Sequence, residues 1–325
     1  MEHVGAIFYR ARNLLLEENA TDQQYLNRAT LIAHEAAHMW FGNLVTMAWF
    51  NDVWTKEVFA NFMAAKIVNP EFPEIDHQLS FLVGHYQPAY EIDRSAGANP
   101  IRQDLPNLAE AGQMYGSIIY HKAPIMMRQL ELILGETVFR EGMQEYLSRH
   151  AGGNVTWPEL ISILDGKTKT KLKAWSDVWV NTPGRPEFQL QRTENGGIRL
   201  RQDDPAGSAR VWPQQFGVRP VTGPDSPVVT LRSTTSSIPW PATLPDDTAA
   251  VLFNANGMGY GHFPASLQLT DSWGELEDLQ KGALLVDLNE NMLARRGPQP
   301  LEYLHALLGL LDVEDNTLVL ELVLD

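Results

Sequence analysis

The segment LIAHEAAHMWFGNLVTMAWFNDVWTKEVFANF, Leu31–Phe62, most constrains what this chain can fold into. It is mostly apolar, as is typical of two core helices, yet it carries His34, Glu35, His38 and Glu57. Buried imidazoles and carboxylates are costly unless a partner binds or neutralises them. The fold must therefore bring these polar side chains to a common partner, and we expect that partner to be a metal ion.

The spacing of the two histidines favours a shared zinc ion. His34 and His38 are four residues apart, so an α-helix places both imidazoles on one face. A catalytic zinc takes three imidazole or carboxylate ligands and keeps a fourth position open. Glu57 follows His38 after eighteen intervening residues, and Gly42 and Asn51–Asp52 allow one helix to end and an antiparallel one to begin. We predict that His34, His38 and Glu57 bind one Zn²⁺ per chain.

Other polar side chains near the histidines suit supporting roles. Glu35 lies about 100° round the helix from His34, so it is a poor simultaneous ligand and is free to act as a base. In H-E-x-x-H metalloproteases this Glu takes a proton from the attacking water. Asn43 and Asn61 are candidate partners of the ligands, with helix-end capping as the alternative for Asn43. A non-metal alternative also exists, in which both histidines are core residues beside an exposed glutamate.

Composition narrows the class of protein. At 325 residues the chain is long enough for two or three domains, and 44% hydrophobic residues are typical of a globular protein. The net charge of −15, without a run of Lys and Arg, argues against a nucleic-acid surface. The absence of cysteine excludes disulfides, Cys-ligated zinc and thiol nucleophiles. Acidic residues interrupt the apolar stretches before they reach spanning length, so we expect no membrane segment.

The hydrophobic pattern changes along the chain and predicts a multidomain α+β fold. Residues 1–10 are rich in β-formers and predict one strand. A helical period then dominates from Thr21 to Pro186, and capping boxes are expected at Thr21 with Gln24 and at Thr156 with Glu159. The period changes to short alternating runs such as FQLQR, GIRLRQ, FGVRPV and PVVTLRS, which predict a small antiparallel β domain. After Asp271 the helical period returns.

Several segments together resemble the zinc aminopeptidases of the aminopeptidase N family, a gluzincin group with the pattern HExxH-x18-E. The strongest similarity is in HEAAHMWFGNLVT and WFNDVWTKEVFANF. MEHVGAIFY resembles the family's exopeptidase strand, and YGSIIYHKAPIMMRQLE resembles its Tyr-x-Lys-Gly segment. WVNTPGRPEF and the β region ending in NANGMGYGHF follow the family's order, so the resemblance covers essentially the whole chain.

The resemblance implies a domain layout. We expect a mainly helical, thermolysin-like catalytic domain at residues 1–183 and a small antiparallel β-sandwich domain at residues 184–267. Residues 268–325 are expected to begin a carboxy-terminal helical domain. The family's amino-terminal β domain and most of its carboxy-terminal domain have no counterpart in this sequence. We therefore expect the chain to be a fragment of a longer protein, and its compartment and oligomeric state stay open.

The resemblance also implies roles for individual residues in the hydrolysis of the amino-terminal bond of peptides with a free amino end. Zinc would be bound by His34, His38 and Glu57, with Glu35 activating the water, Tyr120 stabilising the oxyanion and Glu2 binding the substrate's α-ammonium. Two alternatives stay open: a non-catalytic scaffold of the same fold, and a related zinc hydrolase with endopeptidase or epoxide hydrolase action.

The sequence departs from the family pattern at a few positions near these residues. Lys56 and Val58 replace the family's Asn and Gly on either side of the third ligand. His3 replaces the family's Asn beside Glu2, and Ala123 replaces the Gly that follows the family's Lys, which is Lys122 here. None of the changes removes a predicted ligand, so we expect them to alter the shape of the substrate cleft and the preferred substrate.

Overall fold

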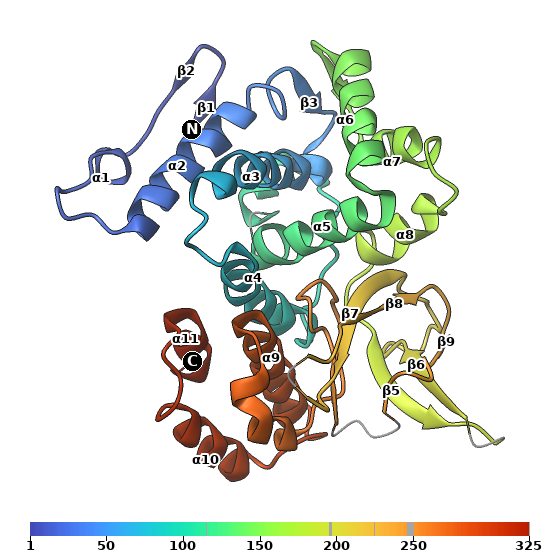
Figure 1. Ribbon diagram of the computed structural model, residues 1–325. Coiled ribbons are helices and arrows are strands. Elements are labelled where there is room, and N and C mark those ends of the chain that lie inside the picture. The colour runs from blue at the N-terminus through green and yellow to red at the C-terminus, as the bar shows by residue number, and fades with distance from the viewer. Residues whose placement is uncertain (115, 195–196, 224, 246–249, 325) are drawn as a thin grey trace. The chain divides into compact units, whose positions relative to one another are not determined.

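The computed structural model describes residues 1–114, 116–194, 197–223, 225–245 and 250–324 (Figure 1). The chain forms two compact units, which are described separately below. Unit 1 contains residues 1–77 and 99–182, and unit 2 contains residues 78–98 and 183–325. The fold is mixed α/β, with many helices and small, mostly antiparallel sheets. Among the described residues, no helix combines the length and the apolar character needed to cross a bilayer.

Unit 1 is mainly helical. Its elements are β1 (Glu2–His3), β2 (Ala6–Ile7), α1 (Ala11–Leu14), α2 (Asp22–Ala37), β3 (Val45–Met47), η1 (Phe50–Asp52), α3 (Val53–Val68), η2 (Asn69–Glu71), η3 (Leu108–Met114), η4 (Ile118–Lys122), α5 (Ala123–Leu134), α6 (Glu136–His150), β4 (Gly153–Val155), α7 (Trp157–Asp165) and α8 (Leu172–Trp179). Helix α3 packs against α2, α5 and η4. Its side chains Trp54, Phe59 and Ala60 are fully buried, so α3 lies at the centre of the core.

Local sequence signals set the ends of the two helices that matter most for the site. Thr21 and Gln24 form the expected capping box, in which each residue's side chain accepts from the other's backbone N–H. Helix α3 ends at Val68, and Pro70 lies in the following turn, as expected because proline cannot continue the hydrogen-bond ladder. The second capping box, Thr156 with Glu159, is also confirmed.

The single strand predicted for residues 1–10 is wrong. The chain instead forms a small hairpin, in which β1 and β2 pair antiparallel with Glu2 opposite Ile7 and His3 opposite Ala6. Gly5 has a φ of +82°, a conformation that glycine adopts without steric cost, and it reverses the chain between the two strands. The hairpin carries the backbone of Glu2 against Asn43, whose side-chain Nδ2 donates to the Glu2 carbonyl over 3.3 Å.

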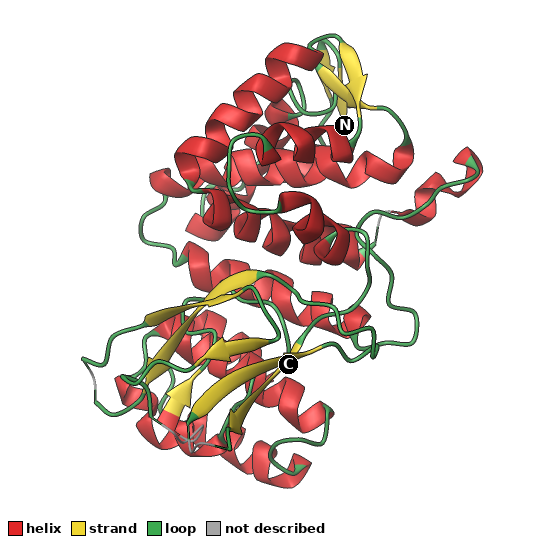
Figure 2. Cartoon of the chain, turned by 90° about the vertical axis from the view of Figure 1, so that its right-hand side faces the viewer, coloured by secondary structure: helices red, strands yellow, loops and turns green. Residues whose placement is uncertain are grey.

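Unit 2 combines two small sheets with helices (Figure 2). Its elements are α4 (His77–Asp93), β5 (Glu187–Arg192), β6 (Ile198–Asp203), β7 (Gln214–Pro220), β8 (Val229–Ser233), β9 (Ser237–Pro239), β10 (Val251–Leu252), η6 (Leu267–Glu275), α9 (Asp278–Leu293), α10 (Pro300–Leu310) and α11 (Thr317–Leu324). The sheets have the antiparallel orders β5-β6-β9 and β10-β7-β8. Side chains from both, among them Phe188, Leu200 and Phe216, join one hydrophobic cluster. The four alternating runs form β5 to β8, as predicted.

Helix α4 is anchored within unit 2 by its tyrosines and its last residue. Tyr86 Oη donates to the carbonyl of Gly257 over 2.7 Å. Tyr260 Oη donates to the Asp93 carboxylate over 2.8 Å. These bonds join residues about 170 positions apart in the chain. The sequence-based layout had placed α4 within residues 1–183, and the contacts instead group it with the β strands of unit 2.

Candidate metal centre

Helices α2 and α3 bring the three predicted zinc ligands together. The Nε2 atoms of His34 and His38 lie 3.0 Å apart. Glu57 Oε2 lies 3.6 Å from the first and 3.8 Å from the second. His38 and Glu57 are buried and His34 is half-buried. The three side chains therefore present one donor atom each to a common point inside unit 1.

Hydrogen bonds on the far side of each imidazole fix its tautomer. His34 Nδ1 lies 2.8 Å from Asn61 Oδ1, and His38 Nδ1 lies 3.0 Å from the carbonyl oxygen of Phe41. Because both partners are oxygens that accept, each Nδ1 carries the hydrogen in the neutral ring. Each Nε2 then has a lone pair, and the two lone pairs face each other at short range. A cation between them relieves this repulsion.

The donor set fits zinc. With metal–nitrogen bonds of about 2.0–2.1 Å, a tetrahedral ion holds two nitrogens about 3.3 Å apart, close to the separation here. Burial and the neighbouring His38 lower the pKa of His34, although Glu57 and Asn61 oppose them. A lowered pKa favours the neutral imidazole, the form that binds metal. Three nitrogen and carboxylate ligands match a catalytic rather than a structural zinc site, because a structural site takes four protein ligands.

Glu35 lies beside the cluster without contributing to it. A donor atom from each of Glu2, Glu35 and His38 falls within 4.8 Å of the other two. Glu35 Oε1 accepts from the amino group of Met1 over 3.1 Å. Its Oε2 is buried and has no hydrogen-bond partner within the described ranges. A carboxylate oxygen that is desolvated and unpartnered next to a metal-binding cluster is well placed to accept a proton.

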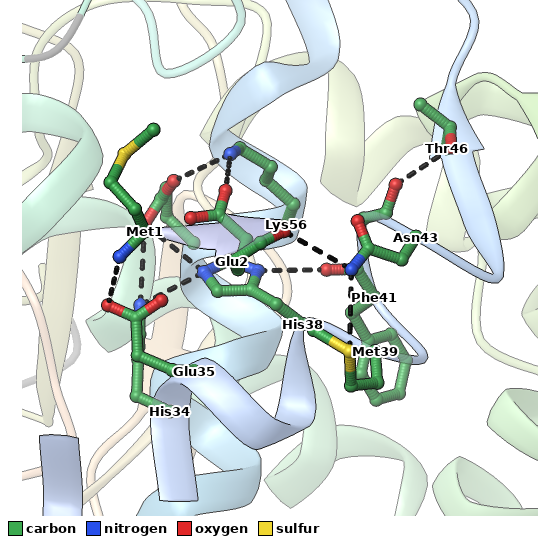
Figure 3. A network of polar contacts seen from close by, with 12 residues as sticks. Met1, Glu2, His34, Glu35, His38, Met39, Phe41, Asn43, Thr46 and Lys56 are labelled. Carbon is green, nitrogen blue, oxygen red and sulfur yellow. Dashed lines mark hydrogen bonds and ion pairs between the residues drawn. The ribbon is translucent and has the colours of Figure 1, made fainter. Parts of the chain in front are cut away.

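The carboxylate of Glu2 is held by the ammonium group of Lys56, in the same unit (Figure 3). Lys56 Nζ lies 2.5 Å from Glu2 Oε1 and 3.3 Å from Glu57 Oε1. Burial disfavours the charged form of Glu2, but the hydrogen bond and charge of Lys56 outweigh it and lower the pKa of this carboxyl to about 2. Lys56 stood out in the sequence because it departs from the family pattern. Its contact with Glu2 was not predicted, because the two residues are 54 positions apart in the chain.

Tyr120 lies in η4, a π-helical turn that packs against α3 and so against the helix of Glu57. Its side chain is half-buried. Its role at the oxyanion stays a prediction that rests on the resemblance. The backbone carbonyl of Phe41, which orients His38, was not predicted, because side-chain patterns carry no signal for a backbone acceptor.

A buried mononuclear cluster of two histidines and a glutamate, with a second glutamate beside it, is typical of metal-dependent hydrolases. The profile of the Peptidase family M1 domain matches residues 1–179, which is more than half of the chain. The chain therefore belongs to peptidase family M1.

Curated relatives match over different lengths. Tricorn protease-interacting factor F2 of Thermoplasma acidophilum is 28% identical over 99% of this chain and 40% of its own length. Aminopeptidase N of Streptomyces lividans is 34% identical over 63% of this chain and 25% of its own length. Puromycin-sensitive aminopeptidase of Caenorhabditis elegans is 33% identical over 62% of this chain and 21% of its own length. The chain thus spans between about a fifth and two fifths of these relatives.

Proposed function

We propose that this chain carries the active site of a zinc-dependent aminopeptidase, which hydrolyses the amino-terminal bond of peptides. The observation that carries the proposal is the convergence of His34 Nε2, His38 Nε2 and Glu57 Oε2 beside the unpartnered Oε2 of Glu35. Family membership supports it, as do the names of two relatives described as aminopeptidases. The non-catalytic alternative has no support from this site, since each predicted ligand and the predicted base are present.

In the proposed reaction the chain's own residues position and move protons. Zinc would be held by His34, His38 and Glu57, and when bound there it supplies Lewis acidity and lowers the pKa of a water. Glu35 takes a proton from the attacking water and passes it to the leaving amine. Tyr120 donates a hydrogen bond to the oxygen on which charge develops.

Glu2 selects the amino end of the peptide. Its carboxylate lies within 4.8 Å of a donor atom of Glu35. In any amino acid the α-nitrogen and the carbonyl carbon are two bonds apart, about 2.5 Å. A peptide whose ammonium binds Glu2 therefore presents its first carbonyl, and no later one, to Glu35. This geometry accounts for removal of one residue at a time from the amino end.

We also propose the finer domain layout that the resemblance implies. Residues 1–183 would form a thermolysin-like catalytic domain, residues 184–267 a β-sandwich and residues 268–325 the beginning of a helical domain. The shared core of the two sheets supports the sandwich. The one departure from this layout that we propose is α4, which we place with the sandwich because Tyr86 bonds to Gly257 and Asp93 to Tyr260.

The test combines metal content with hydrolysis of an aminoacyl anilide. The parent chain should bind about one zinc and release the anilide. Glu35→Gln should keep the zinc and lose about a thousandfold or more of the activity, because the base is gone. His34→Ala should lose the zinc, whereas His305→Ala, an exposed histidine of α10, should change neither quantity. Undiminished hydrolysis by Glu35→Gln, or a zinc-loaded parent without hydrolysis, would reject the proposal.

A further inference from the structure

The candidate active site already contains an ammonium group. Lys56, in α3, directly precedes Glu57, and its Nζ contacts the carboxylates of both Glu2 and Glu57. The side chains of Lys56 and Glu2 are each less than a fifth exposed. The bond to Glu2 is thus a largely buried, charge-assisted hydrogen bond, which is stronger than an ion pair on an open surface.

The charge balance of the site changes with Lys56. Glu2, Glu35 and Glu57 contribute three negative charges, and two ammonium groups each contribute one positive charge: Lys56, which contacts Glu2 and Glu57, and the amino group of Met1, which contacts Glu35. Without the lysine the largely buried carboxylate of Glu2 would lose its charged partner, and it would attract a ligand's ammonium through a weakly screened site. The chain therefore supplies internally the charge that a peptide's amino end would supply.

The geometry allows Lys56 to give up its bond to Glu2 without disturbing the rest of the site. The backbone of Glu2 is held by the β1–β2 hairpin and by Asn43, so the residue stays beside the site independently of Lys56. Lysine has a flexible four-carbon stem and three donors, and Lys56 Nζ has a second acceptor at Glu57 Oε1. When a ligand's ammonium binds Glu2, Lys56 can keep its bond to Glu57.

We infer that Lys56 is a specificity-determining residue that competes with the substrate's α-ammonium for Glu2. The inference rests on the proposed function of Glu2 as the amino-end subsite. Each free-amine ligand must displace Lys56 before it binds, whereas a neutral ligand gains nothing from the displacement. The preference for a free amino end over a neutral one is therefore weaker in this chain than Glu2 alone would produce.

The test measures binding without hydrolysis. The probe is 3-methylbutylamine, an ammonium with no bond to cleave, and 3-methylbutanol is its neutral counterpart. Isothermal titration of the full chain at neutral pH, with and without zinc, should show at least tenfold tighter amine binding for Lys56→Met than for the parent. Binding of the alcohol should not change. Lys56→Arg should resemble the parent because it keeps the charge.

Matched variants separate this effect from general changes in charge. Lys66→Met removes a lysine from the same helix, where it pairs with Glu131, and should leave amine binding unchanged. Lys56→Gln provides a second neutral variant if Lys56→Met does not fold, as judged by circular dichroism. Unchanged or weaker amine binding in both neutral variants overturns the inference, and so does a failure of the amine to bind any form.

Kinetics distinguish this inference from the proposed function. If the chain hydrolyses aminoacyl anilides, Lys56→Met should lower KM about tenfold, with a smaller change in kcat, because the competition acts on binding. If the parent holds zinc but hydrolyses nothing, the aminopeptidase proposal fails. The titration with the amine then still decides whether Lys56 occupies an ammonium subsite.

Discussion

The side chain of Asn61 controls the orientation of the His34 ring, whose Nε2 is the proposed metal ligand. Asn61 Oδ1 lies 2.8 Å from His34 Nδ1, which fixes the hydrogen on that nitrogen and leaves Nε2 as the donor to a metal. Partners of this kind orient the ligand ring and raise its basicity. In the proposed site Asn61 would thus act on the metal through His34, from the helix that also carries Glu57.

Asn61→Ala should weaken zinc binding by about 10- to 100-fold, because the ring loses its orienting partner. Competition with a chromogenic chelator measures the affinity. Asn27→Ala is the matched control, since Asn27 lies on α2 and bonds only the exposed side chain of Gln23 among the contacts described. Equal zinc affinity in parent and Asn61→Ala would show that the hydrogen bond does not tune the site.

Asp287, in α9, gives a second prediction at the scale of one residue. It is 2% exposed, and its Oδ2 has no hydrogen-bond partner within the described residues. Burial and the charge of Glu290 raise the pKa of the Asp287 carboxyl well above its usual range, and Arg185 only partly opposes them. The folded chain therefore holds this proton more tightly than the unfolded chain, so the residue's contribution to stability falls as pH rises above the unfolded pKa.

Asp287→Asn should raise the melting temperature at pH 7.5 and have little effect near pH 4, since the amide carries no charge at either pH. Each 1 kcal/mol is worth about 2–4 °C in a unit of this size. Asp278→Asn on the same helix should act in the opposite direction. Its carboxylate accepts from Lys281 and Asn316, which outweigh burial and lower its pKa. A melting temperature for Asp287→Asn that is lower at pH 7.5 would contradict this account.

At the scale of elements, Asp52 ties the start of α3 to two distant segments. Its carboxylate accepts from Arg102 Nε over 2.6 Å and from the backbone N–H of Trp157, the first residue of α7, over 3.2 Å. The side chain of Asp52 is 1% exposed. These bonds fix where α3 begins, and therefore where Glu57 lies one turn further along.

Asp52→Asn should destabilise unit 1 by about 3 kcal/mol, because it leaves the Arg102 guanidinium without its buried counter-charge. Urea denaturation followed by tryptophan fluorescence measures the loss. Asp22→Asn, in the exposed first turn of α2, should cost much less. If both variants lose the same stability, the buried pair is not what fixes α3.

At the scale of elements, the sequence predicted the features that depend on neighbouring residues and missed those that depend on residues far apart in the chain. The capping box at Thr21 and the histidine pair of α2 depend on residues within four positions, so the sequence was sufficient to predict both. Strands β3 and β4 were missed because each has three residues, and Val45 pairs in parallel with Gly153, over a hundred positions away. The same distance effect hid the bond between Lys56 and Glu2. The sequence predicted that His34, His38 and Glu57 lie together, and only tertiary packing showed which groups hold them in place.

At the scale of the whole molecule, the candidate metal site belongs entirely to one of the two compact units. Each predicted ligand and the predicted base lie within residues 1–77. A ligand that binds only the folded form stabilises it by an amount set by its concentration and affinity, about 2.7 kcal/mol at a hundredfold excess over Kd. This added stability slows the hydrogen exchange of those backbone amides that exchange only when the structure around the metal site opens.

Zinc should therefore increase hydrogen-exchange protection in peptides from α2 and α3 and leave those from β7 and β8 unchanged, provided that the units open separately. Exchange followed by mass spectrometry, with and without the metal, measures this directly. His34→Ala is the control and should remove the gain in α2 and α3. A gain of equal size in β7 and β8 would contradict separate opening, because it requires that both units unfold in one cooperative step. Destabilisation of unit 2 through its buried charges would then also weaken zinc binding in unit 1.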